Sequence, residues 1–226
     1  MVAEAGKITA LITSDPMQAR AIAELLIGFG KPARGKILVD GIEATPANSS
    51  DSVHPRSIWI SPDGPMMAGT IESNLHSHGK PKALSEIMEA VRLAGMYDSV
   101  QNLVDGLATM VAQDDARLEP DQKFRLGIAR AILRCPKLVV AEEPSVRVPA
   151  EVESANLDAL RQLSQQGSAV VVLPNRLETL RHADSIIVLH DHRVSAQGLH
   201  AKLLESSELY RHLNYVRFSP LRHIRG

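Results

Sequence analysis

The stretch from Leu118 to Ser145 constrains the fold of this chain more than any other part of the sequence. It opens with Glu119-Pro120-Asp121, residue types that start helices, and the apolar side chains that follow at a spacing of four predict one buried helical face: Phe124, Ile128 and Ile132. Lys137 to Ala141 then predicts a short buried strand, which ends in Glu142 and Glu143. A helix that leads into a buried strand ending in acids predicts an α/β fold with charge at one edge of its sheet.

The composition is that of an ordinary globular protein, with 44% apolar and 23% charged residues in a chain of 226. This length predicts one sizeable core in a single domain, residues 1–226. The net charge of −1, without a basic stripe of interleaved aromatics, argues against nucleic-acid binding. No run approaches the roughly 18 apolar residues of a transmembrane helix, so we expect any membrane connection to run through another chain or a further segment.

The cysteine and histidine patterns favour neither a disulfide nor a metal site. The single cysteine, Cys135, follows the apolar end of the predicted helix and is expected to be a small core residue rather than a nucleophile. Two histidine pairs, His76 with His78 and His190 with His192, have no third ligand in register. The sequence therefore predicts no metal site.

The central stretch resembles the segment that joins the signature motif to the Walker B strand in the nucleotide-binding domain of exporter-type ABC transporters. That family has LSGGQ, a helix containing IARAL, a proline, four apolar residues and Asp-Glu. The chain keeps the framework of this pattern: Leu118, Gln122, Ile128-Ala129-Arg130-Ala131, Pro136 and Leu138-Val139-Val140. The resemblance implies an α/β, P-loop NTPase-like core with a helical subdomain at about residues 70–135 and a C-terminal tail at about residues 214–226.

Other motifs of the family follow in the same order along the chain. Gly69-Thr70-Ile71 matches the Q-loop run, and Ala183 to Leu189 matches the strand after the switch motif. Gly35 to Ile42 predicts a strand and an Asp-Gly turn, which resembles a hairpin of the family's antiparallel subdomain. Further strands of that subdomain precede the Walker A strand in the family, whereas Met1 falls just before it here. The resemblance therefore implies a partial antiparallel β subdomain, in a chain that is either shortened or cut from a longer one.

The residues that touch ATP in the family are mostly replaced, beginning with the Walker A loop, GxxxxGK[ST]. In that loop, backbone N–H groups and the lysine hold the phosphates. Aligning Lys7 to Thr13 with the Walker A strand places the loop on residues 13–20, which contain no glycine. Ala19 occupies the position of the lysine.

Asp15 and Pro16 predict that the helix after this strand caps itself, because aspartate is a favoured N-cap and proline suits the first helical turn. The protein's own carboxylate then replaces the phosphate of the ligand. Ser14 lies on the same loop, and Arg20 is a candidate substitute cation. A solvated surface arginine is the favoured interpretation of Arg20.

Two further motifs of the family have changed in the same direction. Glu119, Pro120 and Asp121 replace the serine and paired glycines of the signature, and two carboxylates at a helix start would repel a triphosphate. The Q-loop glutamine falls at Pro62. Met66-Met67 lies where the family contacts its transmembrane partner, and plain packing under a loop is an equally good interpretation.

The Walker B end is the part closest to the family pattern. Glu143 matches the catalytic carboxylate, and Glu142 replaces the aspartate that holds magnesium-bound water. Asn175 stands at the switch histidine and can form hydrogen bonds but cannot carry its charge. The positions that the resemblance assigns to nucleotide binding are Ser14, Ala19, Arg20, Glu142 and Asn175, with Glu143 as an idle catalytic carboxylate.

The family hydrolyses ATP to drive transport, and the replacements predict a degenerate pseudo-ATPase that acts as a structural or regulatory partner. No cofactor is expected, except ATP with magnesium if residual binding survives. The implied partners are an ABC transmembrane domain, a second nucleotide-binding domain or both, at the cytoplasmic face of a membrane, reached through a partner or as part of a longer membrane chain. Two alternatives remain open: an ATP-hydrolysing transporter subunit, favoured by Glu143, and an interaction module outside transport that reuses the fold.

Overall fold

The computed structural model describes residues 1–44, 56–61, 66–76, 82–112 and 118–218. Its centre is a six-stranded sheet in the order β10-β9-β1-β8-β7-β4. The strands of this sheet are β1 (Ile8–Thr13), β4 (Ser57–Ile60), β7 (Leu138–Glu142), β8 (Ala169–Leu173), β9 (Ser185–His190) and β10 (Arg193–Gly198). Neighbouring strands run parallel except β9 and β10, which form an antiparallel pair. The carboxyl ends of β1, β7 and β8 therefore meet at one edge of the sheet.

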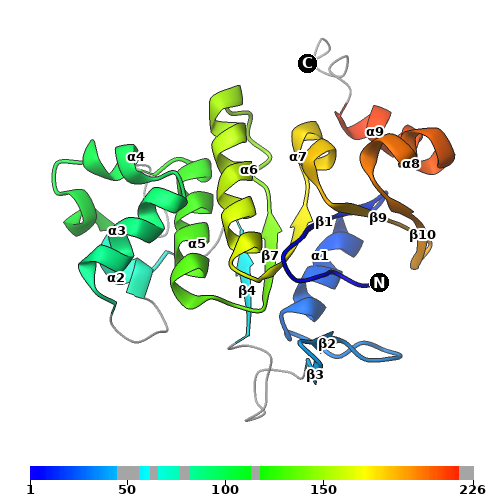
Figure 1. Ribbon diagram of the computed structural model, residues 1–226, viewed down its shortest axis with the longest axis horizontal. Coiled ribbons are helices and arrows are strands. Elements are labelled where there is room, and N and C mark those ends of the chain that lie inside the picture. The colour runs from blue at the N-terminus through cyan, green and yellow to red at the C-terminus, as the bar shows by residue number, and fades with distance from the viewer. Residues whose placement is uncertain (45–55, 62–65, 77–81, 113–117, 219–226) are drawn as a thin grey trace.

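Helices cover both faces of the sheet and form a separate group at one end (Figure 1). The helices packed on the sheet are α1 (Pro16–Leu26), α5 (Pro120–Arg134), α6 (Ala150–Gln165), α7 (Leu177–His182), α8 (His200–Ser206) and α9 (Glu208–Phe218). The separate group contains α2 (Ile71–His76), α3 (Leu84–Leu93) and α4 (Tyr97–Gln101). Figure 1 shows this group on the far side of α5 and α6 from α7, α8 and α9.

Alternate side chains of the central strands enter two separate cores. In β1, Ile8, Ala10 and Ile12 belong to the core under α5 and α6, whereas Leu11 belongs to the core under α1. The alternation follows from the pleat of a strand, which directs successive side chains to opposite faces. It explains why the strand runs are continuously apolar: the central strands are covered on both faces.

The predicted amphipathic helix is confirmed as α5, in which Phe124, Ile128 and Ile132 are all buried. Gly127 lies in the middle of α5, where glycine normally lowers helix stability. Its place is explained by close packing on β4, because a Cβ there would lie 2.8 Å from Cγ2 of Ile60. A glycine thus sets how closely α5 approaches the sheet.

The prediction of a buried Cys135 is wrong. The residue is exposed, and it ends α5 in the left-handed region with φ of 49°. Its Sγ lies 3.2 Å from the carbonyl oxygen of Ile132. The apolar period of the helix stops at this cap, because the left-handed residue turns the chain towards β7, and the period therefore does not extend to Cys135.

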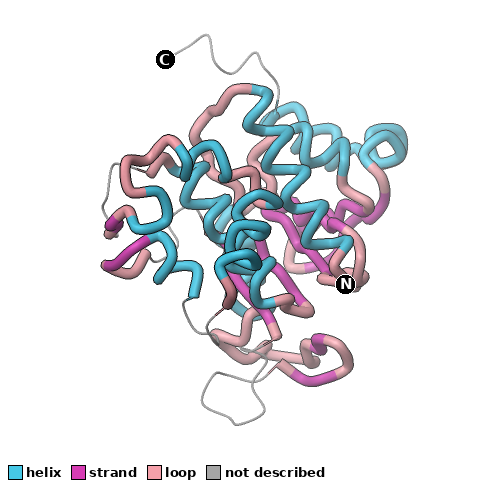
Figure 2. Tube along the Cα trace, turned by 60° about the vertical axis from the view of Figure 1, so that its left-hand side comes forward, coloured by secondary structure: helices cyan, strands magenta, loops and turns pink. Residues whose placement is uncertain are grey.

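Two small two-stranded sheets complete the described elements. The predicted Asp-Gly turn is confirmed between β2 (Leu38–Val39) and β3 (Ile42–Glu43), with φ of 54° at Asp40 and 76° at Gly41. Positive φ at both central residues is typical of a type I′ hairpin turn. The second pair is antiparallel and joins β5 (Gly69–Thr70) to β6 (Met110–Val111), which follows α2, α3, α4 and the short 3₁₀ helix η1 (Gly106–Ala108). Figure 2 shows the β2–β3 hairpin standing apart from the large sheet.

Helix α9 extends beyond the expected start of the tail at residue 214 and ends at Phe218. The extra turn is held down by Arg217, whose guanidinium donates to backbone carbonyls on the sheet edge. Residues 219–226 of the predicted tail lie outside the described residues. Among the helices that are described, none combines the length and the apolar character needed to cross a membrane.

Candidate functional site

The connection between β1 and α1 consists of Ser14 and Asp15 alone. Asp15 Oδ1 accepts the backbone N–H of Met17 at 2.9 Å, and α1 begins at Pro16, so the predicted self-capped helix start is confirmed. The Thr13 hydroxyl accepts the N–H of Asp15 at 3.2 Å and donates to the side-chain oxygen of Gln18 at 2.7 Å. The connection is therefore a tight turn closed by its own hydrogen bonds.

The first turns of α1 carry Ala19, which aligns with the phosphate-binding lysine, and Arg20, the candidate substitute cation. Ala19 is buried in the core between α1 and the sheet. Arg20 is exposed, and its guanidinium carbon lies 5.3 Å from the centroid of the Trp59 ring on β4. Its Nε lies 3.7 Å from Glu24 Oε1, one helical turn further along. Arg20 thus has an aromatic and an acidic neighbour.

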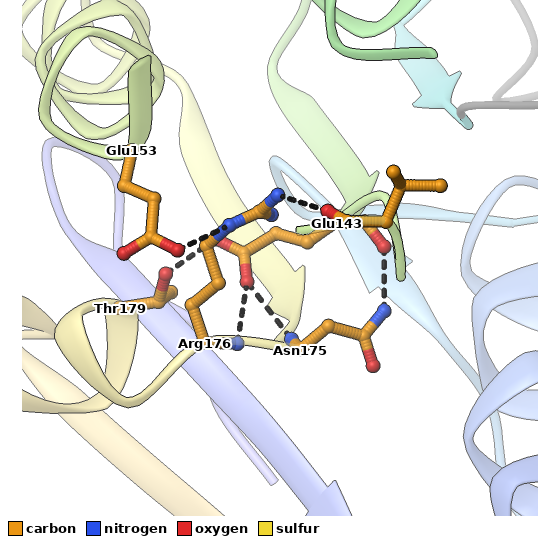
Figure 3. A network of polar contacts seen from close by, with 6 residues as sticks. Glu143, Glu153, Asn175, Arg176 and Thr179 are labelled. Atoms are coloured by element: carbon orange, nitrogen blue, oxygen red, sulfur yellow. Dashed lines mark hydrogen bonds and ion pairs between the residues drawn. The ribbon is translucent and has the colours of Figure 1, made fainter. Parts of the chain in front are cut away.

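Glu143 follows β7 directly and is 2% exposed. Its Oε2 accepts the backbone N–H groups of Asn175 at 2.8 Å and Arg176 at 3.1 Å, and its Oε1 accepts the hydroxyl of Thr179. The side-chain amide of Asn175 donates in turn to the Glu143 carbonyl oxygen at 2.5 Å. Figure 3 shows these bonds joining the end of β7 to the loop after β8 and to α7. We call this set of bonds the Glu143 clasp.

The electrostatics of the clasp are dominated by burial. Burial raises the pKa of the Glu143 carboxyl, and the bonds from Thr179 and Asn175 and the nearby charge of Arg176 oppose the rise. Glu142, at the last position of β7, has a buried Oε2 with no hydrogen-bond partner among the described residues. A buried carboxylate oxygen without a donor is costly, so this atom is suited to accept from a water or to contact a cation.

Arg217 of α9 crosses the same edge of the sheet. Its Nη1 lies 3.4 Å from the carbonyl oxygen of Thr13 at the end of β1, and its Nη2 lies 3.2 Å from that of Pro174 after β8. Burial lowers the pKa of this guanidinium. Because Pro174 directly precedes Asn175, Arg217 connects the β1–α1 turn to the loop that holds Glu143.

The start of α5, at the signature position, is less acidic than the sequence suggests. Asp121 is paired with Arg125 at 2.6 Å, and both side chains are almost buried. The Glu119 N–H donates to the Gln122 side chain at 2.9 Å. The expected repulsion of an anion by two carboxylates is therefore reduced to that of Glu119, because an arginine one helical turn along offsets Asp121.

Known proteins match most of this chain in sequence. No model of a known protein family matches the chain. It is 31% identical over 221 residues to the ABC transporter ATP-binding protein YwjA of Bacillus subtilis, across 97% of this chain and 38% of that protein. It is 30% identical over 214 residues to an ATP-dependent lipid A-core flippase of Chromobacterium violaceum, across 95% and 36% respectively.

A solved structure shows the same likeness in three dimensions. The structure of a bacterial Atm1-family ABC exporter with ATP bound matches with a TM-score of 0.82 at 25% identity, over 93% of this chain. The chain belongs to the family of ABC nucleotide-binding domains. The resemblance found in its motifs and the P-loop NTPase-like α/β fold are thereby confirmed. This ABC domain spans 38% of the first of these relatives and 36% of the second.

The ABC domain brings some of the predicted site residues together and separates others. Glu143 and Asn175 are in direct contact, and Glu142 lies beside them at the end of β7. Ser14, Ala19 and Arg20 lie on the β1–α1 connection and the first turns of α1. Their assignment to nucleotide binding stays a prediction.

Sequence reasoning missed three side chains of this edge: Arg176, Thr179 and Arg217. A signal existed for Thr179, because it lies in the first turn of α7, which begins two residues after Asn175. Pro62, at the Q-loop glutamine, lies outside the described residues, as does His78. Within the described part of the chain, no group of three or more His, Cys, Asp or Glu side chains is placed to hold a metal ion.

Proposed function

We propose that this ABC domain is catalytically degenerate and acts as a structural or regulatory partner in a transport complex. The observation that carries the proposal is the two-residue connection between β1 and α1, in which the Asp15 carboxylate accepts the N–H of Met17. Anion sites at helix starts need free N–H donors and small residues around them. Here a carboxylate has taken one donor and brings negative charge to the position where the family binds phosphate.

The energetic consequence for ATP is large. A hydrogen bond to a charged group contributes roughly 1.5–3 kcal/mol, and the lysine position holds Ala19, which faces the core. The chain has lost the lysine and one or two N–H donors, and it has gained a repelling charge. Since each 1.4 kcal/mol is about tenfold in affinity, these changes together weaken ATP binding by several orders of magnitude. These residues do not fit a triphosphate, so we assign no catalytic step to the chain.

The Glu143 clasp supports the same proposal. A general base must lie within hydrogen-bond reach of the proton that it removes. Both oxygens of Glu143 already accept from Asn175, Arg176 and Thr179, which makes this carboxylate a structural acceptor. Glu142 is better suited to its family role, since its buried Oε2 has no partner among the described residues.

The partner that we propose is an ABC transmembrane domain, a second nucleotide-binding domain or both. The support is the likeness to a lipid A-core flippase and to an ABC exporter, each of which this chain covers by about a third. The domain would then sit at the cytoplasmic face of a membrane, either through its partner or as part of a longer chain. Of the pair Met66-Met67 predicted to contact that partner, Met67 is 44% exposed and remains a candidate, whereas Met66 is 5% exposed and packs in the core.

An ATP-hydrolysing transporter subunit is the second candidate. It is favoured by Glu143, which keeps the catalytic carboxylate position, and by relatives whose names state ATP binding or ATP dependence. In that case the β1–α1 turn would have to open to admit phosphate.

Magnesium-dependent ATP hydrolysis by the purified chain separates these two functions. The wild type is compared with Glu143→Gln, and an intact ABC nucleotide-binding domain serves as the positive control. The proposal predicts the same background rate of phosphate release from both forms of the chain. Turnover that is present in the wild type and lost in Glu143→Gln would overturn it and establish an ATPase.

A further inference from the structure

A pocket of about 400 Å³ lies between the loop after β7, the first turn of α7 and the end of α9. The loop contributes residues 144–148, and α9 contributes Arg217 and Phe218. The β1–α1 turn with Ser14 and Asp15 is not part of its lining. The lining does include Asn175, at the family's switch position, so the pocket adjoins the family's nucleotide site at that residue but not at the β1–α1 turn.

The two acidic side chains of the pocket wall are already matched by arginines. Glu153 Oε1 lies 3.2 Å from Nε of Arg176, and Glu178 Oε1 lies 3.0 Å from Nη1 of Arg181. Figure 3 shows Glu153 and Arg176 joined above the Glu143 clasp. Within each pair the arginine offsets the charge of the glutamate, so the two pairs add no net charge to the wall.

Two more arginines of the wall have no carboxylate partner. Arg147 is exposed and makes no ion pair or hydrogen bond with any described residue. Arg217 donates to carbonyl oxygens of Thr13 and Pro174 and pairs with no carboxylate in the described part of the chain. The pocket therefore carries two positive charges that its own wall does not balance.

Arg176 supplies a further sign that the wall is incomplete. The residue is 8% exposed, yet its Nη1 is buried with no hydrogen-bond partner among the described residues. Its Nη2 donates to the carbonyl oxygen of Val146, and its Nε faces Glu153. A buried guanidinium N–H without an acceptor is costly, and a small shift towards an anion in the pocket would satisfy it.

We propose that this pocket binds a phosphate-type oxyanion, as inorganic phosphate or pyrophosphate or as the phosphate of a small organic molecule. Guanidinium groups match phosphate oxygens in paired hydrogen bonds, and two unbalanced arginines match a dianion. Val146, Val148 and Phe218 give the pocket an apolar side that can receive the organic part of such a molecule. The inference goes beyond the proposed function and does not require ATP at the Walker A position.

Titration calorimetry of the whole chain with pyrophosphate, inorganic phosphate and phenyl phosphate tests the proposal. We expect Arg147→Gln and Arg217→Gln each to weaken binding by about tenfold or more, the loss of one charge-assisted contact. Arg193→Gln on β10, an exposed arginine outside the pocket, is the matched control for charge and should change nothing. Arg217→Gln is checked by thermal melting, whereas Arg147 is exposed and unpartnered, so its variant keeps the fold.

The results of these titrations either support or overturn the proposed anion site. Tighter binding of phenyl phosphate than of inorganic phosphate identifies a small phosphorylated molecule, and equal affinity identifies free phosphate; both support the pocket. No heat with any of the three anions at millimolar concentration would overturn it, as would equal weakening by Arg193→Gln. Binding that is lost in Arg20→Gln but kept in Arg147→Gln would place the anion at the β1–α1 turn, which contradicts both this inference and the proposed function.

Discussion

Replacing Glu143 by alanine removes the acceptor of the Glu143 clasp, and we expect it to destabilise the domain strongly. The backbone N–H groups of Asn175 and Arg176, at 2.8 and 3.1 Å, and the hydroxyl of Thr179 lose their partner together. A buried donor left unpaired costs about 1–3 kcal/mol. The variant also removes a buried charge, which is itself unfavourable, and this gain offsets part of the cost. We therefore expect the free energy of unfolding to fall by about 3–5 kcal/mol.

Glu143→Gln is the matched control for this loss. Its amide oxygen can accept from Asn175 and Arg176, and its NH₂ group can donate to the Thr179 oxygen. We therefore expect its stability to lie within about 1 kcal/mol of the wild type. In thermal melting, at about 2–4 °C per kcal/mol for a domain of this size, the alanine variant should melt roughly 6–20 °C below the wild type.

The raised pKa of Glu143 fixes the sign of the pH dependence. Below pH 4.5, the ordinary pKa of a glutamate carboxyl, this carboxyl is protonated in the folded and unfolded states alike, so it adds no electrostatic cost to folding. As the pH rises from there through the raised folded-state pKa, the unfolded chain ionises first and the wild type loses stability. Relative to the wild type, Glu143→Gln should therefore gain stability as the pH rises from 4.5 towards neutrality. An alanine variant that melts with the wild type would refute the clasp, and a pH-independent difference would refute the raised pKa.

Two further variants test the cap of α1 and the packing of α5 on the sheet. Asp15→Ala should lower the free energy of unfolding in urea by about 1 kcal/mol through loss of the α1 cap, with Asp15→Asn as the control that keeps an acceptor; equal stability of all three forms would contradict the cap. Gly127→Ala should cost about 1–3 kcal/mol because its Cβ would lie 2.8 Å from Ile60 Cγ2, and Gly127→Ala combined with Ile60→Ala should cost less than the sum of the single changes. Strict additivity would mean that α5 does not rest on Ile60.

The elements that the sequence predicts well are those fixed by local patterns. The buried face of α5 follows from the spacing of Phe124 and Ile128, and the start of α1 follows from the residue types of Asp15 and Pro16. The exposure of Cys135 was not predicted, because its left-handed conformation leaves no periodic signal.

The contacts at the candidate site depend on the tertiary fold and were not predictable from spacing. Glu143 and Asn175 meet across 32 residues because β7 and β8 pair in register and end at the same edge. Arg217 and Thr13 are 204 residues apart in the chain, and their contact depends on how α9 packs. The partner of Asp121 could have been anticipated, because Arg125 follows it at the helical spacing of four.

The central claim, that the β1–α1 turn has lost the phosphate site of this family, is tested most directly by calorimetric titration of the chain with ATP and magnesium. An intact ABC nucleotide-binding domain is the positive control, and Arg20→Gln and Arg147→Gln distinguish the turn from the arginine-lined pocket. At millimolar ATP, we predict that neither the heat of binding nor the shift in melting temperature, if either is seen, changes in Arg20→Gln. Micromolar binding that survives Arg147→Gln and is lost in Arg20→Gln would contradict the claim.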